Sequence, residues 1–229
     1  MLLNLILSGD LRSLFIGALL CIPSVVICLS FHEACHGLAA YLMGDHTAKA
    51  AGRLTLDPLA HIDPWGFLCM MLLGFGWARP VPVDISQFRN RRLGMGITAF
   101  AGPLANIILA FIAYFIMLML MINGGADMNS FLQIMTELFY YIASLSVGLA
   151  VFNLLPIHPL DGSRILDAIL PFKAQIRYQN FLHRYGSVIL LVVVMFIWWG
   201  GISLLIQPVR NAIYHAAQSA AFAIAGIPT

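Results

Sequence analysis

The sequence predicts an all-α polytopic membrane protein with about four spanning helices, a re-entrant segment and a short membrane-associated β-hairpin. Hydrophobic residues make up 61% of the 229-residue chain and charged residues only 10%, whereas soluble domains average about 45–50% apolar and about 25% charged residues. Several apolar runs reach the ~20 residues that cross a hydrocarbon core. The net charge of +2 provides no large basic surface, which excludes a nucleic acid as partner.

The apolar runs place the helices along the chain. We expect spanning helices over residues 12–43, 94–122, 131–155 and 185–206. Segment 64–78 is apolar but short, and glycines interrupt it. Residues 52–57 alternate with period two, which predicts the strand hairpin. We expect a single domain over residues 1–206, followed by an interfacial C-terminal tail over residues 207–229.

A histidine–glutamate motif lies inside the first apolar run, as His32-Glu33-Ala34-Cys35-His36. A chain of this composition contains such a pattern by chance roughly 0.002 times. On a helix, His32 and His36 are one turn apart on one face, so both imidazoles can bind one metal ion. Glu33 can then exchange protons with a water on that metal. A bundle-buried pair of histidines hydrogen-bonded to Glu33 is the alternative, but ionisable groups inside a membrane are costly and mostly functional.

A catalytic zinc site usually has a third protein ligand. Asp161 is the best candidate, because two prolines break the preceding helix and irregular backbone is tolerated where it lines a cavity. A helix-capping aspartate is the alternative role. Asp127, Glu137 and Asp167 are weaker candidates because of their positions along the chain.

Three ordered motifs resemble the site-2 protease family of intramembrane zinc metalloproteases. They are His32-Glu33-x-x-His36, Ala101-Gly102-Pro103-Leu104-Ala105-Asn106 and the run from Asn153 to Gly162. The resemblance is to compact bacterial members without PDZ or CBS domains. It implies one zinc ion per chain held by His32, His36 and Asp161, with Glu33 as the catalytic acid and base. Chemically, the same three ligands would also accept cobalt or iron.

The resemblance also suggests where substrate binds. Asn153 matches an asparagine implicated in handling substrate, and residues 52–57 match a β element proposed to pair with substrate. We therefore expect substrate contacts from the strand edge, at Arg53, Leu54, Thr55 and Leu56. Asn106 is a further candidate, either for the substrate backbone or for an interhelical hydrogen bond. His158 stands where the family commonly has proline, three residues before Asp161, and either tunes the metal or is a satisfied polar residue.

Ligand geometry selects the topology. Lys and Arg counts favour a cytosolic basic side whether segment 64–78 spans or re-enters the membrane. His36 and Asp161 can meet only if the first and third spanning helices end on the same side, which requires a re-entrant segment 64–78. The N-terminus then lies outside the cell, and the active site lies nearer the cytosolic side. We expect a multi-pass protein of the bacterial plasma membrane.

The expected function is hydrolysis of peptide bonds within or near transmembrane segments of membrane-protein substrates. A metal-ion or proton transporter using the same His, Glu and Asp cluster is the alternative, although the sequence lacks the internal repeats of transporters. A catalytically dead metal-binding scaffold is a further alternative, against which the intact Glu33 argues.

Overall fold

The computed structural model describes residues 10–73, 76–125, 128–198, 201 and 203–227. In this part of the chain, four helices are long and apolar enough to cross a membrane, in agreement with the expected number. They are α2 (Leu11–Leu42), α6 (Arg91–Gly124), α7 (Ser130–Asn153) and α9 (Phe172–Trp198). The other elements are α3 (Thr47–Ala50), α4 (Pro58–His61), α5 (Pro64–Leu73), the 3₁₀ turn η1 (Ile85–Gln87), α8 (Asp161–Ile169) and α10 (Ser203–Ala225).

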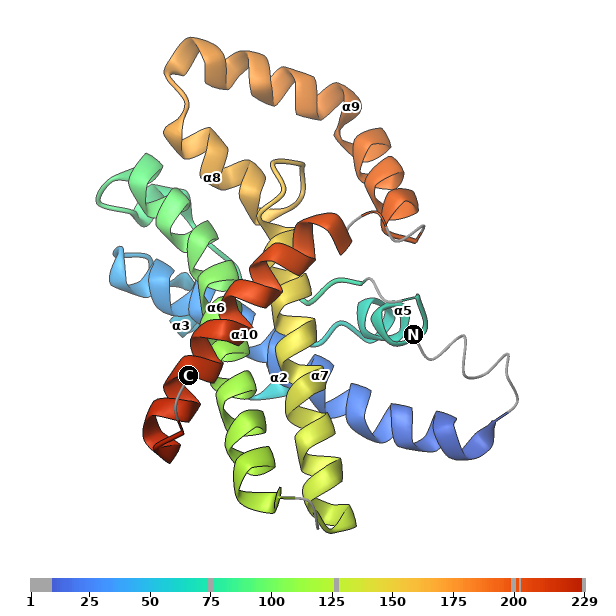
Figure 1. The fold of residues 1–229 in the computed structure, drawn as a ribbon. Coiled ribbons are helices and arrows are strands. Elements are labelled where there is room, and N and C mark those ends of the chain that lie inside the picture. The colour runs from blue at the N-terminus through green and yellow to red at the C-terminus, as the bar shows by residue number, and fades with distance from the viewer. Residues whose placement is uncertain (1–9, 74–75, 126–127, 199–200, 202, 228–229) are drawn as a thin grey trace.

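Helices α6 and α7 form the centre of the fold. They run antiparallel and make the most extensive helix contact among the described elements (Figure 1). Each starts at an asparagine cap: Asn90 Oδ1 accepts from the Leu93 N–H at 3.1 Å, and Asn129 Oδ1 accepts from the Leu132 N–H at 2.9 Å. These caps satisfy backbone donors that the first helical turn leaves free. Helix α7 ends at Asn153, shortly before Pro156 disfavours further helix.

Helix α2 crosses the α6–α7 pair and contacts both (Figure 1). It ends where Gly44 takes a φ of +107°, a conformation that side chains disfavour. The fully buried Asp45 follows, and its carboxylate accepts from the Thr47 N–H at 2.9 Å and from the Asp84 N–H at 2.8 Å. Asp45 therefore fastens the chain around residue 84 to the end of α2.

Small side chains allow the helices of the core to approach closely. Fully buried alanines lie on α6, α7 and α10: Ala110, Ala143, Ala150, Ala217 and Ala221. Between helices in a membrane, close van der Waals packing of this kind takes the place of the hydrophobic effect.

The expected boundary of the C-terminal tail, at residue 206, lies within α10, and this helix packs against α6 and α7. Ala217 and Ala221 are fully buried there, and the Tyr214 ring meets the buried Tyr114 ring edge-on with centroids 5.4 Å apart. The alternation of small and polar residues in this stretch carries little periodic signal, so its packing could not be inferred from pattern alone.

The last apolar span lies earlier than expected. It occupies α9 from Phe172 instead of residues 185–206, and the residues between 156 and 184 contain α8 and the first turns of α9. Polar and charged residues in those first turns lowered the apparent hydropathy there.

The expected β-hairpin around residues 52–57 is wrong, because no strand occurs in the described residues, among which this segment falls. Gly52 reverses the chain after α3 with a φ of +68°, and the Asp57 carboxylate caps α4. The Thr55 carbonyl accepts from the His61 ring at 2.8 Å and not from a neighbouring strand. Between a turn and a cap this segment has no partner with which to form a ladder.

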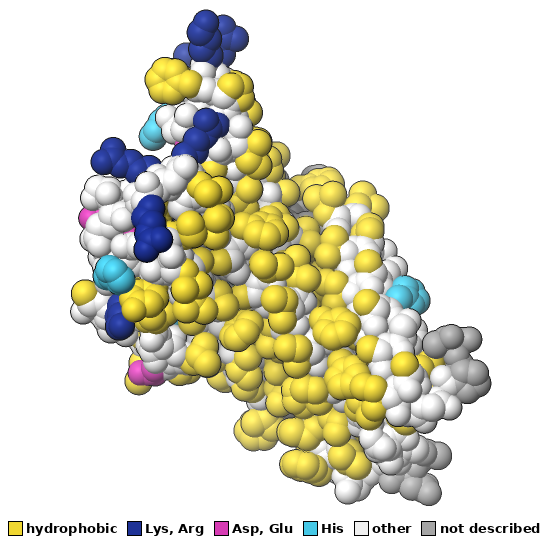
Figure 2. All heavy atoms as spheres, turned by 90° about the vertical axis from the view of Figure 1, so that its left-hand side faces the viewer, with side chains coloured by type: hydrophobic (Ala, Val, Ile, Leu, Met, Phe, Trp, Pro, Cys, Tyr) yellow, Lys and Arg dark blue, Asp and Glu magenta, His cyan; other side chains and the backbone are white. Residues whose placement is uncertain are grey.

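Helix α5 is ten residues long, or about 15 Å at ~1.5 Å per residue, about half the thickness of a hydrocarbon core. After it, the chain returns without regular structure from residue 76 to residue 84. Figure 2 shows Lys and Arg side chains along the top and the left-hand edge of the molecule, while apolar side chains cover most of the middle of this face.

The packing of α10 can be tested with two alanines that are neighbours in sequence. Replacing the fully buried Ala217 with leucine should overfill the α10 interface and destabilise the protein by about 1–3 kcal/mol. The same change at the exposed Ala216 should alter stability by less than about 0.5 kcal/mol. Thermal unfolding of the detergent-purified variants measures the difference, and equal melting temperatures for the two variants would contradict the packing.

Candidate metal centre and catalytic cavity

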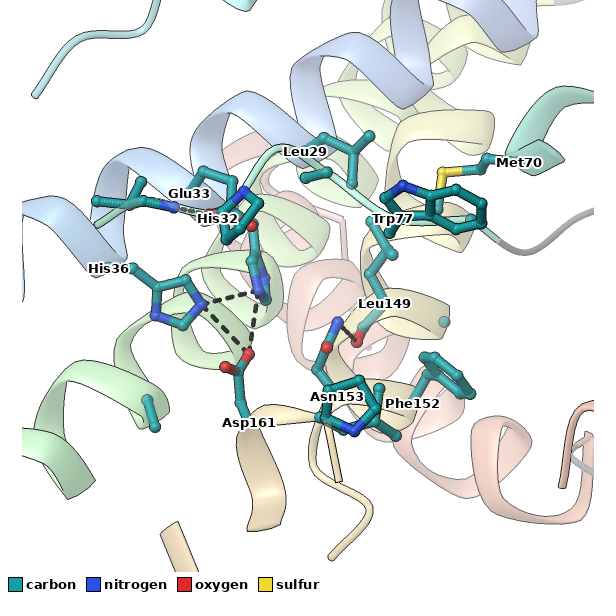
Figure 3. A pocket seen from close by; sticks show the side chains of 18 of the residues that line it. Leu29, His32, Glu33, His36, Met70, Trp77, Leu149, Phe152, Asn153 and Asp161 are labelled. Atoms are coloured by element: carbon teal, nitrogen blue, oxygen red, sulfur yellow. Dashed lines mark hydrogen bonds and ion pairs between the residues drawn. The ribbon is translucent and has the colours of Figure 1, made fainter. Parts of the chain in front are cut away.

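Three side chains converge where α2, α6 and α8 meet (Figure 3). Nε2 of His32 and Nε2 of His36 are 3.0 Å apart, and each lies 3.2 Å from Oδ2 of Asp161. In a tetrahedral zinc site with bonds of about 2.0–2.1 Å, ligand atoms lie about 3.3 Å from one another. The donor types and their separations therefore fit a zinc ion.

The three candidate ligands are largely shielded from solvent. His32 is 4% exposed and His36 is 8% exposed, and the side chain of Asp161 is 12% exposed. Burial raises the pKa of Asp161, but hydrogen bonds and charge interactions with His32 and His36 outweigh it and hold this pKa well below its usual range. Asp161 is therefore ionised at neutral pH, as a metal ligand must be.

The turn after α7 brings Asp161 back to the two histidines. A Cβ atom at Gly162 would lie 2.2 Å from the Leu154 carbonyl oxygen and 2.4 Å from that of Leu155. The chain thus folds onto the end of α7 so closely that only glycine fits beside the ligand. The sequence analysis identified Asp161, whereas this close approach required the structure.

Helix α6 supplies the space in which an ion fits. A Cβ atom at Gly102 would lie 2.4 Å from Nε2 of His36 and 2.6 Å from Nε2 of His32. Glycine at this position therefore keeps the region beside both ligand nitrogens open. The sequence singled out Gly102 only as part of a motif with Pro103.

Two further groups of α6 orient the histidines. Nδ1–H of His36 donates to the Thr98 carbonyl at 2.6 Å, which leaves Nε2 with a lone pair for a metal. The side-chain amide of the fully buried Asn106 lies 3.1 Å from Nδ1 of His32. The sequence analysis missed Thr98, because a backbone carbonyl leaves no trace in residue identity.

Glu33 lies at the wall of a cavity of about 490 Å³, together with His32, His36, Asp161 and Asn153. Its Oε2 accepts from the Val81 N–H at 3.2 Å. Val81 belongs to the irregular segment that returns from α5, so this segment holds the carboxylate beside the ligands. Residue identity alone does not indicate the Val81 contact.

Of the residues expected to bind substrate, only Asn153 lines the cavity. It donates through Nδ2 to the Leu149 carbonyl at 3.0 Å, whereas Asn106 lies behind His32 and outside the cavity lining. Four expected residues do not line the cavity: Arg53, Leu54, Thr55 and Leu56. His158 lies in a second pocket, with its ring 6.5 Å from that of His183, and does not join the ligand group.

Several known proteins are similar to this chain in sequence. Residues 20–193 match the model of peptidase family M50. YwhC of Bacillus subtilis is 37% identical over 170 residues, or 74% of this chain and 77% of YwhC. Rip2 of Mycolicibacterium smegmatis is 28% identical over 77% of this chain and 67% of its own length, and MJ0611 of Methanocaldococcus jannaschii is 31% identical over 66% and 70%. The names of all three provisionally describe zinc metalloproteases. No solved structure is significantly similar to this chain.

The close approach of Gly102 to the histidines can be tested by Gly102→Ala. The added methyl group occupies space beside both Nε2 atoms, so zinc affinity should fall by roughly 100-fold or more, beyond the 10–100-fold typical of changes around the ligands. Competition with a chromophoric chelator measures this affinity. Gly186→Ala is the matched control, because its Cβ would meet its nearest neighbour at an ordinary 3.7 Å; equal zinc affinity in the two variants would contradict the arrangement.

Proposed function

Because this chain belongs to peptidase family M50, the site-2 protease family of membrane zinc metalloproteases, we propose a proteolytic function for it. In this proposal it hydrolyses peptide bonds within or near the transmembrane segments of other membrane proteins. The observation that carries the proposal is the position of Glu33 in the same cavity as three candidate metal ligands, of which His32 and His36 are buried and Asp161 is partly buried. A site that held an ion for structure alone would not need a carboxylate beside it with access to a cavity.

In this proposal His32, His36 and Asp161 hold one zinc ion per chain. When bound, zinc supplies a Lewis acid that polarises the scissile carbonyl and lowers the pKa of the attacking water. Glu33 takes the proton of that water and returns it to the leaving amine. The Val81 N–H fixes the Glu33 carboxylate at the cavity wall, so that its position does not depend on substrate.

Substrate has to lose its helical structure at the site, because the carbonyls of a helix are already hydrogen-bonded internally. Asn153 is the expected residue that meets the unwound backbone, since it lines the cavity at the end of α7. Segment 53–56 has no place in the proposal, because it forms no strand and lies outside the cavity lining.

The proposed orientation places the active site nearer the cytosolic side of a cell membrane. Asp161 is the first residue of α8, and His36 lies against Thr98 near the start of α6. Arg91 and Arg92 begin α6, and Arg164 belongs to α8, so basic residues gather close to the candidate ligands. An excess of Lys and Arg marks the cytosolic side of membrane proteins. Helix α5 is too short to span, which supports the re-entrant path that this orientation requires.

Glu33→Gln separates hydrolysis from metal binding. The amide cannot accept the proton of water, so cleavage of single-span membrane proteins in proteoliposomes should fall by about 10²–10⁴-fold. Zinc content should stay at one ion per chain, because none of the three ligands changes. Full cleavage by this variant would refute the proposal, and loss of metal flux in the same vesicles would favour the transporter instead.

The only other glutamate of the sequence provides the control. Glu137 is exposed on α7 and lies outside the cavity lining. Glu137→Gln should therefore leave both cleavage and zinc content unchanged, which excludes a general effect of removing a carboxylate from the membrane region.

Asn106 is proposed as a positioning residue for His32 and not as a substrate contact. Its amide nitrogen faces Nδ1 of His32, and its buried oxygen has no partner. When the amide rotates, the oxygen can accept from Nδ1–H, and Nε2 is left with a lone pair for the metal. The amide can thus serve His32 in both tautomers, with and without zinc.

This role predicts opposite results for two replacements of Asn106. Asn106→Leu removes the acceptor and should weaken zinc binding by about 10–100-fold. Asn106→Asp keeps an acceptor for Nδ1–H and should stay within about tenfold of the original affinity. Zinc affinity is measured by chelator competition at constant pH, and equal losses in the two variants would indicate a role in packing only.

A further inference from the structure

The catalytic cavity continues past the metal ligands along one face of α7. Five residues of this helix line it at spacings of one, three or four residues, as expected for one face of a helix. They are Ser144, Leu145, Gly148, Leu149 and Phe152. Asn153 follows at the end of α7, beside the ligands (Figure 3).

The opposite wall of this extension is also apolar. It consists of Leu29 from α2, Met70 from α5 and Trp77 from the returning segment, which Figure 3 shows grouped on the side of the cavity away from His36. Leu29 and Met70 are 4% and 5% exposed. No Lys, Arg, Asp or Glu of the described cavity lining comes from these walls; the charged lining residues are Glu33, Asp161 and Arg164.

Gly148 has a different environment from the glycines near the metal. A Cβ atom there would have no heavy atom within 4 Å, whereas Gly102 and Gly162 leave no room for one. The backbone of Gly148 lies inside a regular helix, where glycine is less stable than alanine. Packing therefore does not require this glycine, and its effect is to leave space in the cavity.

We propose that this extension is a specificity pocket that accepts a large apolar side chain of the substrate, with Gly148 setting its depth. The inference rests on the proposed proteolytic function, because the pocket is continuous with the cavity that holds Glu33 and the ligands. Its lining selects for aromatic and long aliphatic residues by removing their apolar surface from lipid or water and by close packing.

The position of Gly148 relates the pocket to the cleaved bond. Gly148 precedes Asn153 by five residues, or about 7.5 Å along the helix. An extended peptide advances about 3.3 Å per residue. The selected side chain of a substrate lying along α7 is therefore about two residues away from the backbone that Asn153 meets.

The test uses two dipeptide hydroxamates that differ only in bearing a phenylalanine or an alanine side chain. Calorimetric titration of the purified zinc-loaded protein should give at least tenfold tighter binding of the phenylalanine compound. Gly148→Leu should fill the pocket and reduce this preference below about threefold, by weakening the phenylalanine compound while leaving the alanine compound unchanged. Gly148→Ala should give an intermediate preference.

The controls distinguish the possible failures. Gly148→Ala favours the helix, so it provides the measurement if the leucine variant does not fold. Gly186→Ala, outside the cavity lining, should keep the full preference. Equal binding of the two compounds by the original protein, or a preference unchanged by both Gly148 variants, would overturn the pocket alone. Failure of both compounds to bind the zinc-loaded protein at all would overturn the proposed function as well.

Discussion

The approach of α6 to the two histidines is the constraint on which the rest of the site depends. Thr98, Gly102 and Asn106 are four residues apart, so they form one stripe along α6. Thr98 orients His36 through its carbonyl, Gly102 leaves the space beside both Nε2 atoms, and Asn106 contacts His32. A single helix face thus supplies both the room for an ion and the groups that orient its ligands. Rotating α6 by one residue would lose all three contributions together, since successive residues differ by about 100°.

Helix α7 contributes both to the candidate metal site and to the wall of the adjoining cavity. Its final residue, Asn153, lines the cavity. The turn that follows brings Asp161 back to the histidines, because Gly162 allows the chain to pack closely against the end of α7. The cavity continues along the same helix as far as Ser144. Because one rigid element contributes to the ligand position and to the apolar wall, the distance between the reacting bond and the pocket is fixed by the helix. The irregular segment ending at Asp84 closes the cavity from the other side, and Asp45 fastens it to α2.

Sequence patterns predicted local structure well where a single physical property of the residues determines it, such as apolarity, helical spacing or the rigidity of proline. The apolar runs indicated four spanning helices, and the histidine spacing indicated a shared helix face. Asp161 was predicted because prolines end the helix before it, and the structure brings it beside both histidines. The strand at residues 52–57 was wrong because a strand needs a partner, which alternation within six residues does not provide. The packing of α10 escaped prediction because its buried alanines resemble those of an exposed helix.

The sequence by itself determined the class of protein and singled out the candidate metal ligands and the candidate general base, because composition and helical periodicity are local properties. Tertiary structure decided which backbone groups assist them. Every residue has a carbonyl and every residue except proline has an N–H, so the Thr98 carbonyl and the Val81 N–H acquire roles only through their neighbours. It also decided that two glycines have opposite surroundings. Gly102 adjoins the candidate ligands, whereas Gly148 adjoins open space. That difference depends on distances between elements, which residue identity does not encode.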